Sequence, residues 1–224
     1  MALSPARDRK MRERYLKYRE MFPDQNEDRC WVAVGESFGL EGDGARTLAA
    51  LKQATAINPE WGKWQLELAK AYLRAKRYAE ALKALEKCDE LDSSGCDKNW
   101  YAENVLYYLG YALFGLKRFK EAAEAWRGAE SAITKWGAPE PLKDFHLHRG
   151  WAHHLEGNFL DAIEAYRRGM VAPGPGDGSE DDVMNEDDVE AAQAMNENIE
   201  RYHGMATQGL RLEGEPLEAV PYTN

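Results

Sequence analysis

Apolar and small residues recur along most of this chain at the spacing of one buried face of an α-helix. Four segments carry a small residue at equivalent points, 34, 41 and 40 residues apart: Gly35, Ala69, Gly110 and Gly150. Around these points, apolar residues follow an i, i+3, i+4, i+7 pattern, which predicts amphipathic helices. A bulky residue stands 16 residues after each point, at Leu51, Leu85, Trp126 and Tyr166. The pattern predicts four antiparallel helical hairpins over residues 28–171.

The length of the repeat indicates the class of fold. A period of this size, with one helical hairpin per unit, is typical of solenoids. One hairpin cannot bury its apolar face alone, so neighbouring hairpins must stack. The small residues would let the second helix of each hairpin approach the first closely. We therefore expect an all-α superhelix, a solenoid of antiparallel helix hairpins that offers an extended concave surface to a partner.

Two further helices are predicted at the ends of the repeat region. Within residues 1–27 the sequence predicts an amphipathic helix, whose apolar stripe is Met11, Tyr15, Tyr18 and Phe22. We interpret it as a cap on the first hairpin, or as a helix that docks on another chain. Residues 187–204 also show helical spacing and are predicted to form a C-terminal capping helix that ends at Gly204.

Two segments lack this periodicity. Residues 172–186 are rich in Pro and Gly and then acidic, which predicts a flexible loop. Residues 205–224 are predicted to form an extended tail.

The first repeat unit resembles a tetratricopeptide repeat. It has a Trp, a pair ending in Gly, an aromatic residue, a small residue and a closing Pro, at Trp31, Val34-Gly35, Phe38, Ala54 and Pro59. About four such units cover residues 28–171. The fourth departs from the pattern, because Arg149 and His153 stand where apolar residues are expected. The resemblance implies a binding protein, such as an adaptor, scaffold or chaperone, that holds a partner segment in a concave groove.

The resemblance also implies which helix face lines that groove. Residues one, five and eight places after the Trp31 position share this face. In the first unit these are Val32, Glu36 and Gly39, so the Lys and Asn with which chaperone-binding members of the family hold a carboxylate are not present. In the later units the candidate partner-binding residues are Lys63, Leu66, Lys70, Leu73, Arg74, Tyr107, Tyr111, Phe114, Leu147, Trp151 and His154.

The aromatic residues of this set leave two interpretations open. Tyr and Trp dominate the energetics of interfaces, which favours a protein or peptide partner. Alternatively, the same rings pack between adjacent helices or under the protein's own tail. A second functional alternative is self-assembly, in which the end helix or tail of one copy docks on the next and forms a homo-oligomer.

Charge and composition exclude several other classes. The net charge is −10, and the segment 171–224 holds 13 acidic and 2 basic residues, so the rest of the chain is close to neutral. Nucleic acid is therefore not an expected partner. The sequence has no apolar stretch long enough for a membrane span. Three cysteines, Cys30, Cys88 and Cys96, cannot all pair, which favours reduced thiols and a cytoplasmic location.

Few residues suggest catalysis. The sequence contains no phosphate-binding loop, nucleophile elbow or HExxH motif, so we expect neither an enzyme nor a cofactor. His146, His148, His153 and His154 form one cluster. Its members are spaced poorly for direct chelation of one metal, which favours ordinary packing. A metal site or an enzyme at this cluster is the alternative from another functional class.

Overall fold

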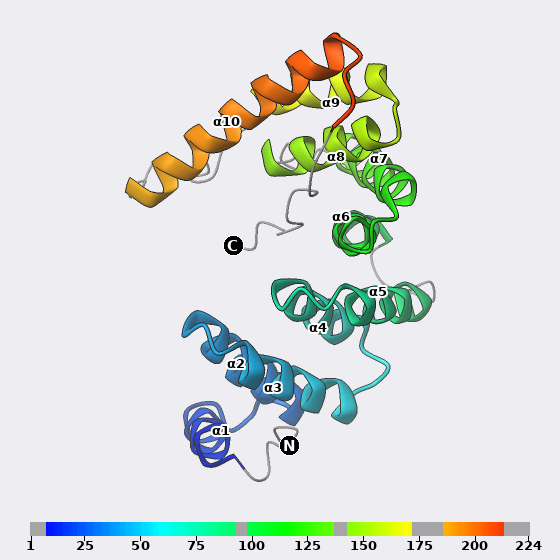
Figure 1. Ribbon diagram of the computed structural model, residues 1–224. Helices are drawn as coiled ribbons and strands as arrows, with labels where there is room; N and C mark the ends of the chain where they lie inside the picture. The colour runs from blue at the N-terminus through cyan, green and yellow to red at the C-terminus, as the bar shows by residue number, and fades with distance from the viewer. Residues whose placement is uncertain (1–7, 93–97, 137–142, 172–185, 213–224) are drawn as a thin grey trace. The chain divides into compact units, whose positions relative to one another are not determined.

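The structure is a computed structural model that describes residues 8–92, 98–136, 143–171 and 186–212 (Figure 1). These residues contain ten α-helices and no strand. Nearly all of the loop predicted for 172–186, and residues 213–224 of the predicted tail, lie outside the described residues. The chain divides into two compact units, Met1–Tyr101 and Ala102–Asn224, called unit 1 and unit 2 below.

The helices follow one another as the predicted hairpins. Unit 1 contains α1 (Arg9–Met21), α2 (Glu27–Leu40), α3 (Gly44–Ile57), α4 (Gly62–Arg74) and α5 (Tyr78–Asp92). Unit 2 contains α6 (Lys98–Gly115) from Ala102 onward, α7 (Phe119–Trp136), α8 (Lys143–Leu155), α9 (Phe159–Val171) and α10 (Glu186–Thr207). Within unit 1, α3 also packs on α4, and within unit 2, α7 also packs on α8. The four hairpins, in chain order, are α2–α3, α4–α5, α6–α7 and α8–α9. Consecutive hairpins therefore stack inside each unit.

The same tight turn joins the two helices of every hairpin. A residue with left-handed backbone ends the first helix each time, with φ between 55° and 76°, at Gly42, Lys76, Lys117 and Gly157. The next residue donates its backbone N–H across the turn to the carbonyl five residues back, over 2.9 Å in all four hairpins. These turn residues are again 34, 41 and 40 positions apart. The turn therefore repeats in register with the small residues, although two of its four left-handed residues are lysines.

The two helices of a hairpin touch where the sequence places its small residues. A β-carbon on Gly110 would lie 2.2 Å from Nε1 of Trp126, and one on Gly150 would lie 2.4 Å from Cε1 of Tyr166. The Trp126 ring is held there by its N–H, which donates to the carbonyl of Tyr107 over 3.1 Å. An aromatic ring thus fills the space that any other residue at these two glycines would need.

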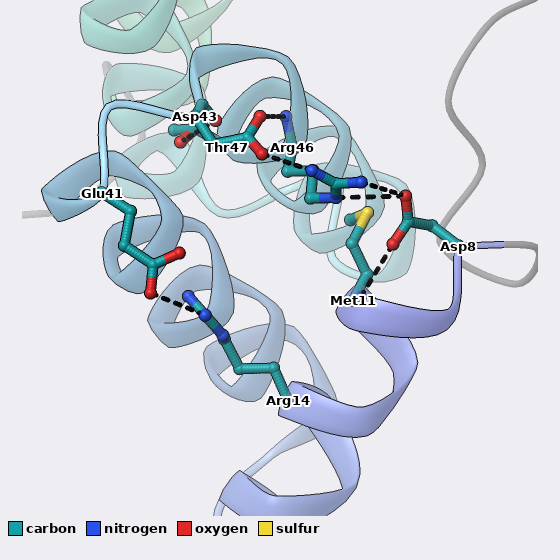
Figure 2. A network of polar contacts seen from close by, with 7 residues as sticks. All are labelled: Asp8, Met11, Arg14, Glu41, Asp43, Arg46 and Thr47. Carbon is teal, nitrogen blue, oxygen red and sulfur yellow. Dashed lines mark hydrogen bonds and ion pairs between the residues drawn. The ribbon is translucent and has the colours of Figure 1, made fainter.

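Helix α1 lies against the first hairpin and is fastened by polar contacts at its start (Figure 2). Asp8 caps α1 by accepting from the backbone N–H of Met11 over 3.0 Å. The guanidinium group of Arg46, from α3, donates to Asp8 and to Asp43. The side chain of Met11 is fully buried under this network.

Further along α1, contacts to α2 continue the attachment. Arg14 donates to the Ser37 hydroxyl and to the Glu41 carboxylate, both over 2.8 Å, and its guanidinium lies 4.0 Å from the centre of the Phe38 ring. Tyr15 stacks on Trp31 with ring centres 4.5 Å apart. α1 therefore covers one side of the first hairpin, as a capping helix would.

At the other end of the chain, α10 packs on both α8 and α9. Ile199 is fully buried against Gly169, and Tyr202 stacks on Trp151 with ring centres 5.4 Å apart. The helix continues to Thr207 and does not end at Gly204 as the sequence suggested. Two residues after the helix, Gly209 has a φ of 65°, which lets the next N–H reach back to the carbonyl of Met205.

Replacing Gly110 by alanine should destabilise unit 2. The added methyl group would displace Trp126, and overpacking of this kind typically costs 1–3 kcal/mol, roughly. Alanine gains about 1 kcal/mol over glycine in a helix, and the close approach of Trp126 puts the cost towards the upper end of the range, so we expect a net loss of up to about 2 kcal/mol. Thermal unfolding followed by circular dichroism would measure it.

Gly35 provides the matched control. A β-carbon there would lie 3.2 Å from Cγ of Leu51, a flexible side chain that can move slightly. Gly35→Ala should therefore leave the unfolding midpoint unchanged or raise it a little. Equal midpoints for Gly110→Ala and Gly35→Ala would contradict the assigned contact with Trp126.

Candidate functional site

Unit 1 contains a cleft of about 440 Å³ whose walls come from α1, α2 and α4. This volume lies within the range of sites that bind small molecules or peptide side chains. The cleft is lined by Tyr18, Gln25, Arg29, Val32, Ala33, Glu36, Trp61, Lys63, Trp64 and Glu67. It is the candidate site for a partner, and it is called the unit 1 cleft below.

Helical spacing explains why α2 supplies so much of the lining. Arg29, Val32, Ala33 and Glu36 stand at i, i+3, i+4 and i+7, which places them on one face of the helix. Val32 is buried, whereas Arg29 and Glu36 are exposed. This face of α2 therefore presents an apolar centre with a cation towards its N-terminus and a carboxylate towards its C-terminus.

A buried carboxylate fixes the start of α4 against α2. Asp28 is only 6% exposed and accepts from Nε1 of Trp64 over 2.9 Å and from the Asn58 amide over 3.0 Å. Burial by itself would raise the pKa of Asp28, but these two hydrogen bonds, together with those from the backbone N–H groups of Arg29 and Asp28, hold the pKa below its ordinary value. Asp28 thus ties the two walls of the unit 1 cleft together.

An exposed indole stands at the mouth of the unit 1 cleft. Trp61 is 46% exposed, although it lies only 6.2 Å, centre to centre, from the buried ring of Trp64. Tyr18 approaches from α1 and contacts Phe22, which is itself 43% exposed. Partly exposed aromatic rings beside a cleft are typical anchors for a protein partner.

The charges of the unit 1 cleft are unevenly matched. Glu67 is held by Lys70, whose Nζ lies 2.9 Å from Oε1. By contrast, neither Arg29 nor Glu36 forms an ion pair with another residue in the described part of the chain. Partial burial raises the pKa of Glu36, and the nearby Glu67 carboxylate raises it further, against the opposing effect of Lys63 and Lys70. The negative charge of ionised Glu36 is therefore only partly balanced by the positive charges around it.

The predicted partner-binding residues of unit 1 fall into two groups. Lys63 lines the cleft, Lys70 lies about two turns further along α4, and Arg74 is exposed at the end of α4. Leu66 and Leu73 are buried in the interior of unit 1. Only the charged members of this predicted face are therefore at the surface.

The predicted residues of unit 2 are mostly interior. Tyr107 is partly exposed, and the other five are at most 4% exposed: Tyr111, Phe114, Leu147, Trp151 and His154. Tyr111 meets Trp126 edge-on at 5.1 Å, and Trp151 is covered by Tyr202 of α10. This is the packing alternative that the sequence left open. Contact of these buried side chains with a partner stays a prediction, on which nothing below depends.

Sequence reasoning missed seven of the ten residues that line the unit 1 cleft, among them Arg29, Trp61 and Tyr18. Arg29 lies one turn before Val32 on the same helix face, so extending the predicted face towards the start of the helix would have found it. Trp61 precedes α4 and has no helical position from which to predict it. Tyr18 was assigned to the apolar stripe of the N-terminal helix, and it reaches the cleft from there.

The four clustered histidines lie inside unit 2. His146, His148, His153 and His154 are each at most 6% exposed. Nδ1 of His154 lies 3.3 Å from the Tyr166 hydroxyl, and its Nε2 lies 2.6 Å from the carbonyl oxygen of Leu210. Among the described residues, no three His, Cys, Asp or Glu side chains are placed to hold one metal ion.

Arg149 stands among these histidines and is also buried. It pairs with Glu130 of α7, which in turn pairs with Arg168 of α9. The carboxylate of Glu130 therefore joins α7, α8 and α9. The residue that it pairs with on α8, Arg149, stands where the repeat pattern expects an apolar residue.

Comparison with known proteins agrees with the helical hairpins. The sequence profile described as "Tetratricopeptide repeat" matches residues 40–93, from the end of α2 through α5. No curated protein sequence matches the chain. In the described ranges, no helix is long and apolar enough to cross a membrane.

Three solved structures share the fold. "MamA MSR-1 C2" is 19% identical with a TM-score of 0.53, over 69% of this chain and 82% of the other. "Crystal structure of MamA" is 20% identical with a TM-score of 0.52, over 78% and 93%. "Crystal structure of MamA protein" is 20% identical with a TM-score of 0.54, over 81% and 91%. The chain therefore carries the tetratricopeptide repeat fold, an all-α solenoid of helix hairpins. This fold supports protein interaction as the general function.

The buried histidines make unit 2 sensitive to acid. Burial, followed by the charges of Arg149 and Arg168, lowers the pKa of His146 to about 3. Burial, followed by Arg149, lowers the pKa of His153 to about 4, although Asp161 opposes this. In an unfolded chain both groups would have a pKa of about 6.5. Between these values the unfolded state binds more protons, so stability falls as the pH falls.

We expect the free energy of unfolding of unit 2 to decrease below pH ~6.5, by up to ~1.4 kcal/mol per pH unit for each histidine. The decrease should level off near pH ~4 for His153. Urea titrations between pH 7 and 5, followed by tryptophan fluorescence, would measure the slope. His146→Gln with His153→Gln should flatten the slope, and an unchanged slope in this double variant would assign it to other groups.

Proposed function

We propose that this protein is an interaction scaffold that binds an extended segment of a partner protein in the unit 1 cleft. The observation that carries the proposal is the half-exposed indole of Trp61 beside a cleft whose mixed lining includes Val32 and Ala33. A large aromatic ring in this position gains interface area on binding at little cost in conformational freedom. The tetratricopeptide repeat fold supports the same general function.

Adaptor and chaperone are the two roles that such binding would serve. Both need a groove that accepts a segment of another chain, and the unit 1 cleft supports either. A cytoplasmic location stays a prediction from the sequence. Self-assembly, in which the bound segment comes from a second copy of the chain, stays the alternative to a different partner.

Trp61→Ala should weaken capture of the partner from the native lysate. Truncation of an aromatic hot spot typically costs about 2 kcal/mol or more, which is roughly thirtyfold in affinity. The full-length chain would be used as bait, with bound proteins quantified by mass spectrometry. Circular dichroism should show an unchanged helix content, because the Trp61 side chain makes no capping hydrogen bond to α4.

Leu40→Ala is the matched control. Leu40 is the most exposed large apolar side chain of the described residues, at 92%, and it is not part of the cleft lining. Its truncation should leave capture within about twofold of the parent. If Trp61→Ala captured the partner as well as the parent did, and Leu40→Ala lost it, the binding surface would lie outside the unit 1 cleft. Recovery of the chain itself as the captured protein would favour self-assembly.

A further inference from the structure

The two charged residues of α2 that line the unit 1 cleft determine how far apart the complementary charges of a ligand must be. Arg29 and Glu36 are seven residues apart on one helix face, which separates them by about 10 Å along the axis. The lining of α2 between them consists of Val32 and Ala33. Along the face of α2 that lines the cleft, a cation is therefore followed by an apolar stretch and then by a carboxylate.

Neither end of this arrangement forms an ion pair with another described residue. The other carboxylate of the cleft, Glu67, is already paired with Lys70. Glu36 has no such pair, and partial burial together with Glu67 raises its pKa, against the opposing effect of Lys63 and Lys70. A cation brought by a ligand would relieve the cost of ionised Glu36, and a carboxylate on the ligand could pair with the exposed guanidinium group of Arg29.

The backbone of an extended peptide fits this spacing. In the polyproline II conformation the chain rises about 3.1 Å per residue and repeats every three residues. Residues three positions apart then point the same way and lie about 9 Å apart. The two residues between them point to the sides, where the aromatic rings of Tyr18 and Trp61 form part of the cleft walls.

We propose that the partner segment is an extended peptide with one acidic and one basic residue about three positions apart, separated by apolar residues. The acidic residue contacts Arg29, the basic residue contacts Glu36, and the apolar residues between them contact Tyr18 and Trp61. This inference rests on the proposed function, because it specifies the chemistry of the segment that occupies the same cleft.

A library of random 12-residue peptides displayed on phage, selected on the full chain, would test the inference. The enriched peptides should carry an acidic and a basic residue about three positions apart, with apolar residues between them. The strongest peptides would then be synthesised, and their affinities measured by isothermal titration calorimetry on the parent and on variants.

Three variants separate the possible outcomes. Glu36→Gln keeps the shape of the side chain and should weaken the selected peptides about tenfold, as should replacement of the peptide's own basic residue by Gln. The two changes together should cost little more than either alone, because both remove the same ion pair. Glu60→Gln is the control, since Glu60 is exposed beside Trp61 but is not part of the cleft lining, and its effect should stay within about twofold.

The results distinguish failure of this inference from failure of the proposed function. Peptides that require Trp61 but carry no such charge pair, or that bind Glu36→Gln as well as the parent, would overturn the inference alone. If no peptide is enriched, or if the enriched peptides bind Trp61→Ala as well as the parent, the proposed use of the cleft is overturned and the inference with it.

Discussion

The two helices of the third hairpin approach so closely that the ring of Trp126 fills the place of a side chain on Gly110. The fourth hairpin has the same contact between Tyr166 and Gly150. Together with the left-handed turn that joins the helices, this contact constrains the geometry of the third and fourth hairpins. The first hairpin has the same turn and a close approach of its own, between Gly35 and Leu51. The orientation of α2, whose face lines the unit 1 cleft, is therefore constrained by contacts made inside its own hairpin.

The repeat itself could be predicted from the sequence because small and bulky residues mark the contact points directly. Its turns could not be predicted as easily. Lys76 and Lys117 adopt left-handed backbone, for which lysine gives no signal, and only their register with Gly42 and Gly157 reveals the shared turn. The end of α10 shows the same limit, since Gly204 and Gly209 are equal candidates by residue type. Only Gly209 lies where the following N–H can close the turn on Met205.

The binding face was harder to predict because helical angles describe one helix in isolation. In a solenoid, each first helix has a neighbour on both sides, so an apolar residue at the angle of the groove packs against that neighbour. Leu66, Leu73 and Trp151 are buried in this way. Lys63 and Arg74 share the same predicted face but stay at the surface, because burial of a charged group costs several kcal/mol, roughly. Residue type therefore decides which members of the face a partner can reach.

Unit 2 shows what happens when a charge does enter that interior. Arg149 departs from the repeat pattern, and because it is buried, its charge requires an oppositely charged partner nearby. Glu130 of α7 supplies that partner and also pairs with Arg168 of α9. A buried ion pair adds little net stability over apolar packing, but it strongly disfavours any arrangement in which the charges separate. The fourth hairpin thus has an ion pair where the first three have apolar residues, and this pair links α8 to α7 and, through Glu130, to α9.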